Sequence, residues 1–398
     1  MHRLIFFFFT LSFISTAACA QPKNISLQSA SGFDSVRKVV NAAIADSAFP
    51  AATVAVLYRD SLVFHEGFGR LTYSTAAARA DTNTIYDLAS LTKVLCTTTS
   101  IMRLYDDGKL KLDDPVSKFI PEFAANGKDS LTIRNLLLHN SGLVAFRPYE
   151  KTCFTANAML TAIYGERLLR SAGDTTIYSD LNFIVLGEVV RRITGKRLDM
   201  YFRDTFIQPL DLTTMQFFPL QDSLKADSLK ARLAPVEFDS GWKSPPLPVR
   251  ALVHDPRAAL QGGVSGHAGL FSTASDAARL MQVLMQGGKA QGKVYLKPQT
   301  VSMFVKRQSS KSTRALGWDT RSADEKAMTG KYFSAGSYGH SGYTGTSIWV
   351  DPVRNLCVVF FTNRVYPTSA NNKIRAVRRL LHDAVIESLG HYHVPPIR

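Results

Sequence analysis

The sequence is poor in cysteine and contains none of the common spaced metal-binding motifs. After residue 20 only Cys96, Cys153 and Cys357 occur, and no two of them form a C-x-x-C pair. Such an odd, widely spaced set predicts buried free thiols rather than a disulfide framework. The nine histidines include no H-E-x-x-H pattern, and His391 and His393 lie in a terminal tail. We therefore expect neither a metal nor an organic cofactor.

Long runs of basic residues are also absent, although the chain is basic overall. Its 47 Lys and Arg against 32 Asp and Glu give a formal net charge of +15. That charge fits either a polyanionic partner, such as nucleic acid, an acidic membrane surface or a cell-wall polymer, or solubility alone. No basic run exceeds a pair, apart from the loose series Lys373, Arg375, Arg378 and Arg379, and no RNA or DNA motif accompanies it. We expect no nucleic-acid partner.

Only the first twenty residues, MHRLIFFFFTLSFISTAACA, form a strongly apolar stretch. His2 and Arg3 precede the apolar residues, and small residues follow them, which is typical of an export signal. Two processing routes stay open: cleavage before Gln21, or a lipobox in which Cys19 is lipidated and tethers the chain to a membrane. No later stretch approaches the roughly 20 apolar residues of a transmembrane helix. The sequence predicts an exported protein of the periplasm or cell envelope.

Both ends of the chain combine strands with helices, whereas the middle is mainly helical. The N-terminal part predicts a linker at 21–32, a helix at 33–47 and two strands within 51–69 joined at Arg59-Asp60. The C-terminal part predicts strands at 343–350 and 356–362 and a helix at 371–389. The middle predicts helices within 131–143, 156–169 and 181–195, ended in the first and last by Gly142 and Gly195, and surface loops at 222–230 and 244–248.

These patterns predict an α/β (α+β) fold in which both chain ends build one antiparallel sheet flanked by helices. A mainly helical lobe is inserted between the two ends. We expect the domain to cover 33–395, with an α/β lobe at about 33–105 and 255–395 and a helical lobe at about 106–254. Clefts between lobes are common ligand sites.

The segment DLASLTKVLCTTTSIM, residues 87–102, carries the first candidate chemistry. Its spacing predicts a helix from about Ser90 to Asp106 that is apolar on nearly every face. Lys93 inside it must find a partner or lose its proton. A desolvated amine three residues from a serine can activate the hydroxyl as a nucleophile, and the spacing matches S-x-x-K. The spacing alone is more typical of an N-cap serine with a lysine that reaches solvent, and it is the uncharged surroundings that favour the catalytic interpretation.

Two later elements add candidate residues. Tyr178-Ser179-Asp180 precedes an apolar helix, where Asp180 would otherwise be an ordinary N-cap and Tyr178 a half-buried aromatic. His340-Ser341-Gly342 leads into a strand, where the glycine permits either a bend or the close approach of a substrate to the backbone.

Two further histidines are expected to be structural. His139 precedes the Asn140-Ser141-Gly142 turn, where a hydrogen bond at a helix end is the simplest role. His267 lies in GGVSGHAG, which lacks the G-K-[ST] ending of a phosphate-binding loop and predicts a tight turn near the cleft. Neither residue enters the predicted catalytic set.

In this order, the three elements resemble the β-lactamase and penicillin-binding protein superfamily of serine hydrolases, whose pattern is S-x-x-K, then Y-x-N, then K-T-G or H-x-G. The likeness is greatest to class C β-lactamases, D-alanyl-D-alanine carboxypeptidases and related esterases. LTIRNLLLHNSGL and LQGGVSGHAGLFSTASDAARL look like two further recurrent segments of that superfamily. The resemblance covers about residues 33–389.

The resemblance implies a role for each motif residue. Ser90 would be the acylated nucleophile, Lys93 would assist its deprotonation, and Tyr178 would take the serine proton and return it to the leaving group. The amides of Ser90 and Tyr343 would form the oxyanion hole. His340, in place of the motif lysine, would lie near the substrate carboxylate, with Ser341 and Gly342 in the same substrate-binding segment.

Two departures from the pattern matter. Asp180 stands where the superfamily more often has asparagine, so it can accept a hydrogen bond from Lys93 and would hold that amine protonated. We therefore expect Lys93 to give electrostatic support while Tyr178 is the base. His340 replaces a permanently charged lysine, which favours carboxypeptidase or esterase activity over efficient β-lactam hydrolysis, although a histidine still donates a hydrogen bond and gains charge at lower pH.

The predicted function is that of an exported serine hydrolase that cleaves an amide or ester related to cell-wall peptide through an acyl-serine intermediate. A β-lactamase is the first alternative. A catalytically silent envelope-binding protein, which holds a peptide or a wall polymer with its basic surface, is the second. The expected partner is a small-molecule or peptide substrate, with cell-wall contact and a membrane tether through Cys19 as open alternatives.

Overall fold

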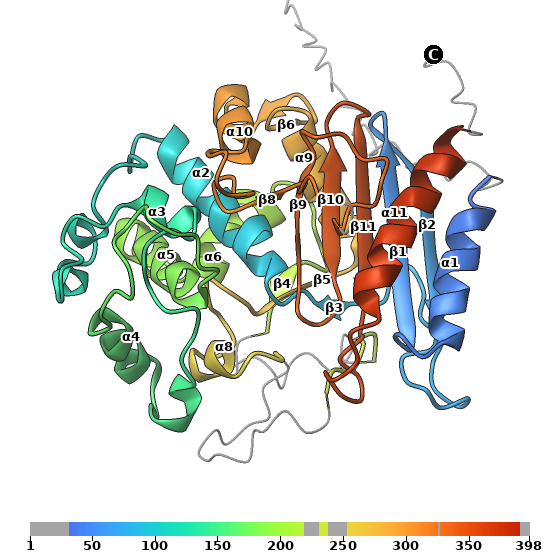
Figure 1. The fold of residues 1–398 in the computed structure, drawn as a ribbon, viewed down its shortest axis with the longest axis horizontal. Helices are drawn as coiled ribbons and strands as arrows, with labels where there is room; N and C mark the ends of the chain where they lie inside the picture. The colour runs from blue at the N-terminus through green and yellow to red at the C-terminus, as the bar shows by residue number, and fades with distance from the viewer. Residues whose placement is uncertain (1–31, 219–230, 238–252, 325–326, 391–398) are drawn as a thin grey trace, which may run out of the picture.

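A six-stranded antiparallel sheet forms the centre of the computed structural model, which describes residues 32–218, 231–237, 253–324 and 327–390 (Figure 1). Its strand order is β2-β1-β11-β10-β9-β8. The strands are β1 (Ala51–Tyr58), β2 (Ser61–Gly69), β8 (Asp319–Thr320), β9 (Tyr338–Ser341), β10 (Ser347–Asp351) and β11 (Leu356–Thr362). Because β1 and β2 come from the N-terminal part and the other four strands from the C-terminal part, the predicted fold class is confirmed.

The two faces of the sheet are covered by different helices. Helices α1 (Asp34–Ala45) and α11 (Ile374–Gly390) pack side by side on one face, whereas α9 (Ala274–Met285) packs against β1 and β11 (Figure 1). Side chains alternate between the faces of a strand. Val54 and Val56 accordingly belong to the core under α1 and α11, while Ala55 and Leu57 belong to the core that α9 shares. The predicted helices at 33–47 and 371–389 and the two strands joined at Arg59-Asp60 are confirmed.

The part of the chain between β2 and β8 is mainly helical. It contains α2 (Thr99–Asp106), α3 (Ile133–Leu137), α4 (Ala156–Tyr164), α5 (Asp180–Thr194), α6 (Leu198–Phe202) and α8 (Pro256–Leu260). Short 3₁₀ turns cover Val116–Lys118, Pro121–Ala124 and Tyr149–Lys151. A small sheet joins β3 (Tyr86–Asp87), β5 (Leu270–Ser272) and β4 (Gln216–Phe217), and after α9 come β6 (Lys289–Ala290), β7 (Lys293–Val294) and α10 (Pro298–Val305).

The predicted helix at 90–106 is present but is not regular. Lys93–Thr98 form a π-helical segment that continues into α2, and a second such segment covers Arg203–Ile207. The hydroxyls of Thr98 and Thr99 donate to the carbonyls of Lys93 and Val94, five residues earlier, at 2.8 and 3.0 Å. These side-chain bonds compete with the usual backbone ladder, an effect that apolar periodicity does not reveal. Residues 91–102 are all buried, so the predicted burial on all sides holds for them, whereas Arg103, Tyr105 and Asp106 in the last turn are partly exposed.

Three predicted elements are shorter in the structure. The strand predicted at 343–350 begins only at Ser347, because Gly342 donates to the carbonyl of Thr346 and closes a tight turn. Within 131–143 only the five-residue α3 is helical, and α4 ends at Tyr164, where Gly165 is the C-cap. Helix α5 ends at Gly195 with a φ of 69°, as the stop signal predicts.

Several predictions fall outside the described residues: the export signal with Cys19, the linker up to residue 31, and the loops at 222–230 and 244–248. The exact lobe boundaries stay a prediction. Cys96, Cys153 and Cys357 are buried and free, as predicted. None of the helices in the described ranges is both long and apolar enough to cross a bilayer.

Candidate active site

Ser90 lies in a strained turn that joins β3 to the π-helical segment. The residue before it, Ala89, has a φ of +46°, in the left-handed region that a residue with a Cβ rarely adopts. The buried carboxylate of Asp87 stabilises this turn by accepting from the Ala89 N–H at 2.8 Å and from the His254 N–H at 2.7 Å. The turn places Ser90 on the wall of a cavity of about 830 Å³.

Lys93 is completely buried, and its ammonium is fully engaged. Nζ donates to Ser90 Oγ at 2.9 Å and to the His267 carbonyl at 3.0 Å, and it lies 2.8 Å from Asp180 Oδ1. Burial by itself would lower the pKa of Lys93, but the Asp180 carboxylate and then the Tyr178 phenol outweigh it and raise that pKa. The amine therefore carries its proton at neutral pH, as the sequence analysis expects from an aspartate at position 180.

Tyr178 joins the pair from the loop before α5. Its ring centre lies 5.0 Å from Lys93 Nζ, and the ring lines the same cavity as Ser90. The rings of His139 and His340 flank it at 4.6 and 5.8 Å between centroids. Ser90 and Tyr178, almost 90 positions apart, thus line one cavity, as the three-motif pattern predicts.

Asp180 bridges Lys93 to a second set of charges that the sequence analysis missed. It is the first residue of α5, with Ser179 as the N-cap, so the alternative interpretation of Asp180 as an N-cap is wrong. Its Oδ2 lies 2.9 Å from Arg257 Nη2, and the same nitrogen lies 2.6 Å from Asp255 Oδ2. Burial by itself would raise the pKa of Asp180, but Lys93 and the neighbouring basic groups lower it. Because no fixed spacing links Arg257 or Asp255 to the motifs, the sequence does not indicate that these two residues belong to the site.

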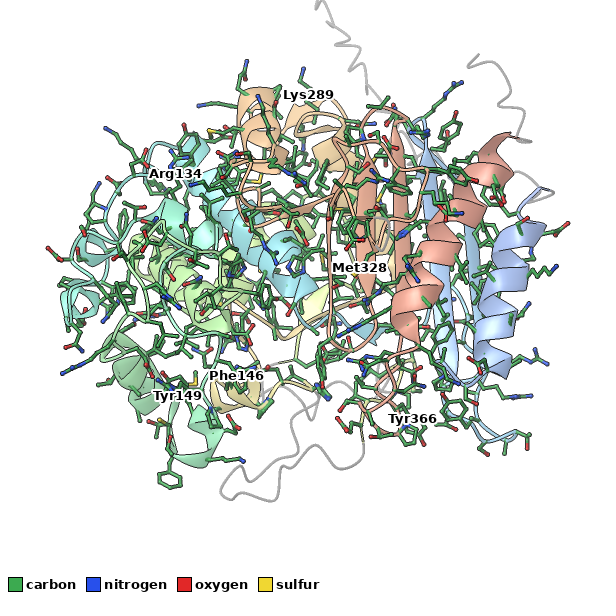
Figure 2. All side chains as sticks on the ribbon, in the orientation of Figure 1. Arg134, Phe146, Tyr149, Lys289, Met328 and Tyr366 are labelled. Atoms are coloured by element: carbon green, nitrogen blue, oxygen red, sulfur yellow. The ribbon has the colours of Figure 1, made fainter. Side chains whose placement is uncertain are left out.

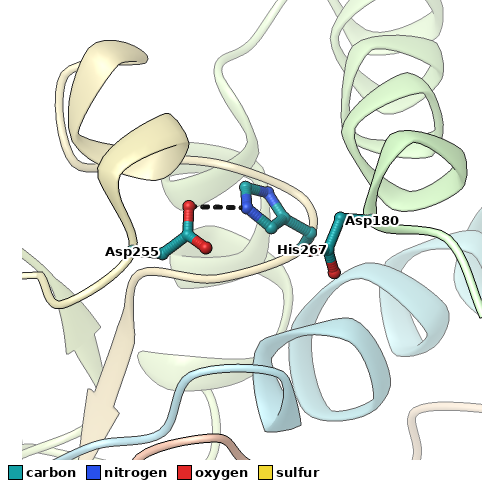
Figure 3. Close-up of side chains that lie close together, drawn as sticks. All are labelled: Asp180, Asp255 and His267. Atoms are coloured by element: carbon teal, nitrogen blue, oxygen red, sulfur yellow. Dashed lines mark hydrogen bonds and ion pairs between the residues drawn. The ribbon is translucent and has the colours of Figure 1, made fainter. Parts of the chain in front are cut away.

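Asp255 holds both the arginine and His267. Its Oδ1 lies 2.9 Å from His267 Nε2 and accepts the N–H groups of Arg257 and Ala258 at 2.9 and 3.0 Å as the N-cap of α8 (Figure 3). Burial would raise the pKa of Asp255, yet the electrostatic interactions and hydrogen bonds with His267 and Arg257 lower it well below its usual range. Phe146, which lies beside α8, places its ring 5.6 Å from the Arg257 guanidinium (Figure 2).

Oxygen and nitrogen atoms of Asp180, Asp255 and His267 lie within 4.8 Å of one another, close enough to suggest a cation site. Arg257 already binds both carboxylates, and Lys93 binds that of Asp180. These two permanent cations balance the two carboxylates, and the cluster fits an ion-pair network better than a metal centre.

The turn after β9 brings a second backbone amide to the cavity beside Ser90. Gly342 is needed for this approach, because a Cβ there would lie 2.4 Å from the Leu88 carbonyl. The hydroxyls of Thr344 and Thr346 donate to the carbonyls of Asp87 and Leu88 at 2.6 and 3.1 Å and hold the two turns together. Tyr343 and Ser90 both line the cavity.

Both backbone N–H groups are free to bind a ligand. Among the described residues, neither the Ser90 nor the Tyr343 N–H has a hydrogen-bond partner. Arg364 fixes the Tyr343 peptide by donating to its carbonyl from Nε and Nη2 at 2.8 and 2.6 Å. Two free donors beside a serine hydroxyl can stabilise a developing oxyanion.

His340 lies in the cavity wall, as expected. Burial first, and then the charges of Arg314 and Lys93, lower the pKa of His340 to about 3. Nδ1 lies 2.9 Å from the carbonyl of Ser341, to which it donates. His340 therefore gains the charge expected at lower pH only in strong acid, and its ring is neutral at physiological pH. Any positive charge near a bound carboxylate must come from other residues.

The described lining of the cavity contains several positively charged arginines. Arg314, Arg364, Arg375, Arg378 and Arg379 all line the cavity. In the sequence, the last three stand out only as part of a loose basic series, and no motif marks Arg314 or Arg364 as site residues.

His139 has the structural hydrogen bond that its position predicts. Its Nδ1 accepts from the Ser179 N–H at 3.1 Å and lies 3.3 Å from the amide nitrogen of Asn182. Burial, followed by the charges of Arg314 and Lys93, lowers the pKa of His139 well below its usual range. His139 thus supports the start of α5 as a neutral ring, directly under Tyr178.

Comparison with known proteins agrees with this geometry. Residues 36–382 match the Beta-lactamase family. The chain therefore belongs to the Beta-lactamase family, whose wider superfamily consists of serine hydrolases and includes the penicillin-binding proteins.

Its relatives include proteins named for peptidase activity. A protein of Escherichia coli strain K12 called "Putative D-alanyl-D-alanine carboxypeptidase" is 32% identical over 352 residues, which are 82% of this chain and 81% of that protein. A protein of the same name from Salmonella schwarzengrund is 34% identical over 354 residues, 83% of this chain and 82% of that one.

Solved structures share the fold. A penicillin-binding protein homologue from Caulobacter crescentus superposes with a TM-score of 0.71 at 23% identity and covers 90% of this chain and 98% of its own. EstCE1, described as a hydrolase with promiscuous acyltransferase activity, has a TM-score of 0.71 at 21% identity and covers 89% and 99%. The recognition of the superfamily from three short motifs is confirmed.

Proposed function

We propose that this chain is an exported serine hydrolase that cleaves an amide or ester related to cell-wall peptide through an acyl-serine intermediate. One observation carries the proposal: the Ser90 hydroxyl lies 2.9 Å from a buried lysine that is itself paired with Asp180, on the wall of a cavity. The carboxypeptidase names of the relatives support a D-alanyl-D-alanine peptide as the substrate class.

In the proposed reaction, the protonated Lys93 stabilises Tyr178 as a phenolate, which removes the proton from Ser90 Oγ. Ser90 Oγ then bonds to the substrate carbonyl carbon, and the N–H groups of Ser90 and Tyr343 hold the resulting oxyanion. Tyr178 returns the proton to the leaving amine or alkoxide as its bond to carbon breaks. Water hydrolyses the acyl-serine ester, which releases a carboxylic acid and restores Ser90.

The test is covalent capture of Ser90. The mature protein is incubated with a fluorescent penicillin and, separately, with a fluorophosphonate, and the intact mass is compared with that of a Ser90→Ala variant. An adduct with either reagent that is lost in the variant supports the serine hydrolase. Absence of both adducts would overturn it in favour of a silent envelope-binding protein.

The same experiment separates the alternatives within the enzyme class. Penicillin capture with slow release supports a carboxypeptidase, whereas rapid turnover of penicillin supports a β-lactamase. Ester turnover without penicillin capture supports an esterase. The neutral His340 favours an esterase over a β-lactamase, because its pKa of about 3 leaves it uncharged toward the carboxylate of a β-lactam, a group that an ester substrate need not carry.

Export is part of the proposal and has its own measurement. The mass of the N-terminal peptide from the cell envelope distinguishes a chain that begins at Gln21 from one that begins at a lipidated Cys19. A full-length chain that still begins at Met1 in the cytoplasm would contradict export.

A further inference from the structure

The cavity beside Ser90 is lined by far more positive than negative charge. Of the described residues, five arginines line it, whereas Asp319 is its one acidic residue. Among the described residues, no carboxylate lies within ion-pair distance of any of the five guanidinium groups: those of Arg314, Arg364, Arg375, Arg378 and Arg379. Elsewhere in the described structure, arginines such as Arg134, Arg191 and Arg257 do have such partners. The cavity therefore concentrates unneutralised guanidinium groups.

Arg378 is the most unusual of the five, because it is 5% exposed and lacks a counterion. It donates from Nη2 to the Thr346 carbonyl at 2.8 Å, while its Nε is buried without any partner. Burial, followed by the charges of Arg364 and Arg375, lowers the pKa of Arg378 to about 9. A buried unpaired charge is strongly unfavourable, and an anion in the cavity would relieve the penalty.

Arg314 repeats this pattern from the loop between α10 and β8. Its Nη1 is buried without a partner among the described residues, and its guanidinium lies 5.2 Å from the centre of the Tyr178 ring. Donors without partners on two different elements that line the cavity suggest an occupant that reaches both.

The position of three arginines on α11 supports the same conclusion. Arg375, Arg378 and Arg379 fall in the first two turns of the helix, and its first turn contains no acidic residue. The partial positive charge of a helix N-terminus disfavours cations there, so this placement costs helix stability. The cost is offset if the arginines and the helix N-terminus act on the same anion.

We propose that the wall formed by Arg314, Arg375, Arg378 and Arg379 is a subsite for a second anionic group of the substrate, a phosphate or an additional carboxylate. This group is distinct from the single carboxylate expected at the His340–Gly342 segment. The inference rests on the proposed function only in that the substrate occupies this cavity. A single carboxylate would neutralise one guanidinium and leave the others unpaired.

Anion binding is measured first without any need for catalysis. Calorimetry on the Ser90→Ala chain, at constant ionic strength, compares inorganic phosphate, succinate and acetate. Charge-assisted hydrogen bonds to two arginines should make the dianion bind about 10-fold or more tightly than acetate. Tighter binding of phosphate assigns a phosphate group, and tighter binding of succinate assigns a second carboxylate. Equal affinity for all three anions would overturn the subsite.

Two variants localise the effect. Arg375→Gln with Arg379→Gln should weaken binding of the favoured dianion about 10-fold. Arg59→Gln is the matched control, because Arg59 is an exposed arginine at the β1–β2 turn, outside the cavity and without an ion-pair partner in the described structure. Equal loss in the control and the double variant would reveal general charge attraction and overturn the assignment.

The kinetic test uses thioesters of one acyl group with thiol leaving groups that carry zero, one or two carboxylates. The dicarboxylate should exceed the monocarboxylate in kcat/KM by about 10-fold, and the double variant should remove that difference. Turnover of all three at equal kcat/KM would overturn the subsite while leaving the hydrolase intact. Dianion binding without labelling of Ser90 by either the fluorescent penicillin or the fluorophosphonate would overturn the hydrolase while leaving the subsite intact.

Discussion

Lys93 Nζ lies 2.8 Å from Asp180 Oδ1, although the two residues belong to different helices and Lys93 is fully buried. The ammonium also contacts Ser90 and the His267 carbonyl. Because the carboxylate raises the pKa of Lys93, the amine stays protonated at neutral pH and is not available as a base. In the proposed reaction its role is therefore electrostatic, and Tyr178 moves the proton.

Asp180→Asn should change the pH dependence of catalysis. Without the carboxylate, burial dominates and lowers the pKa of Lys93, so a new ionisation should enter the profile of kcat/KM from the alkaline side. In the wild type the raised pKa keeps Lys93 protonated at neutral pH. Identical profiles for the two proteins would contradict electrostatic support by Lys93.

The same substitution should also destabilise the protein. It leaves the buried charges of Lys93 and Arg257 without their shared carboxylate, a change that costs about 3 kcal/mol of unfolding free energy. Denaturant titration at pH 7 measures it. Asp113→Asn is the control, because the Arg134–Asp113 pair is exposed and its loss should cost below about 1 kcal/mol.

Gly342→Ala should reduce turnover through the backbone alone. Its Cβ would lie 2.4 Å from the Leu88 carbonyl and force the Tyr343 amide away from Ser90. Loss of one oxyanion donor should lower kcat by about 100-fold. Gly336→Ala is the matched control, since the nearest atom to its Cβ lies at 3.8 Å. Comparable kcat in both variants would exclude the Tyr343 amide from the oxyanion hole.

Recognition of a substrate carboxylate should not depend on protonation of His340. Its pKa of about 3 keeps the ring neutral throughout pH 5–8. KM for a substrate with a C-terminal carboxylate should therefore show no histidine ionisation in that range, and His340→Gln should have the same flat profile. A tenfold rise in KM between pH 6 and 7 in the wild type alone would contradict a neutral His340.

Acid should destabilise the protein through its buried histidines. Burial lowers the pKa of His382 to about 4, against about 6.5 when unfolded. Between these values the unfolded chain binds the extra proton, so stability is full above pH 6.5 and falls as the pH decreases toward 4. His382→Gln should reduce the slope of unfolding free energy by about 1.4 kcal/mol per pH unit near pH 5. An unchanged slope in denaturant titrations would show that His382 is already charged in the folded protein.

The sequence predicts those features that depend on local spacing. Lys93 is recognisable as a buried cation because no other charged residue lies between Asp87 and Arg103, and the glycines at 142 and 195 mark turns that the structure contains. The strands at 51–69 follow from β-rich runs around a polar dipeptide. The motif residues Ser90, Lys93, Tyr178 and His340 meet at one cavity because the superfamily fold brings them there.

Features that depend on contacts between distant segments could not be predicted. Arg257 reaches Asp180 across 77 positions without any shared motif, and Arg314 and Arg364 enter the cavity from unrelated loops. The low pKa of His340 likewise depends on burial and on the charge of Arg314. Each of these properties depends on contacts between distant segments in the folded protein. The periodicity of a sequence indicates only which residues share a face of one helix or strand.

The pairing of β1 with β11 also constrains how this chain can fold. The backbone N–H of Ala51 donates to the side chain of Asn363, 312 positions later. From Ala52 to Tyr58, every residue of β1 is paired with a residue of β11 along one edge. The central strands therefore cannot assemble until nearly the entire polypeptide has left the ribosome. A topology so dominated by non-local pairing folds slowly, and a chain truncated before β11 should stay unfolded and sensitive to proteases.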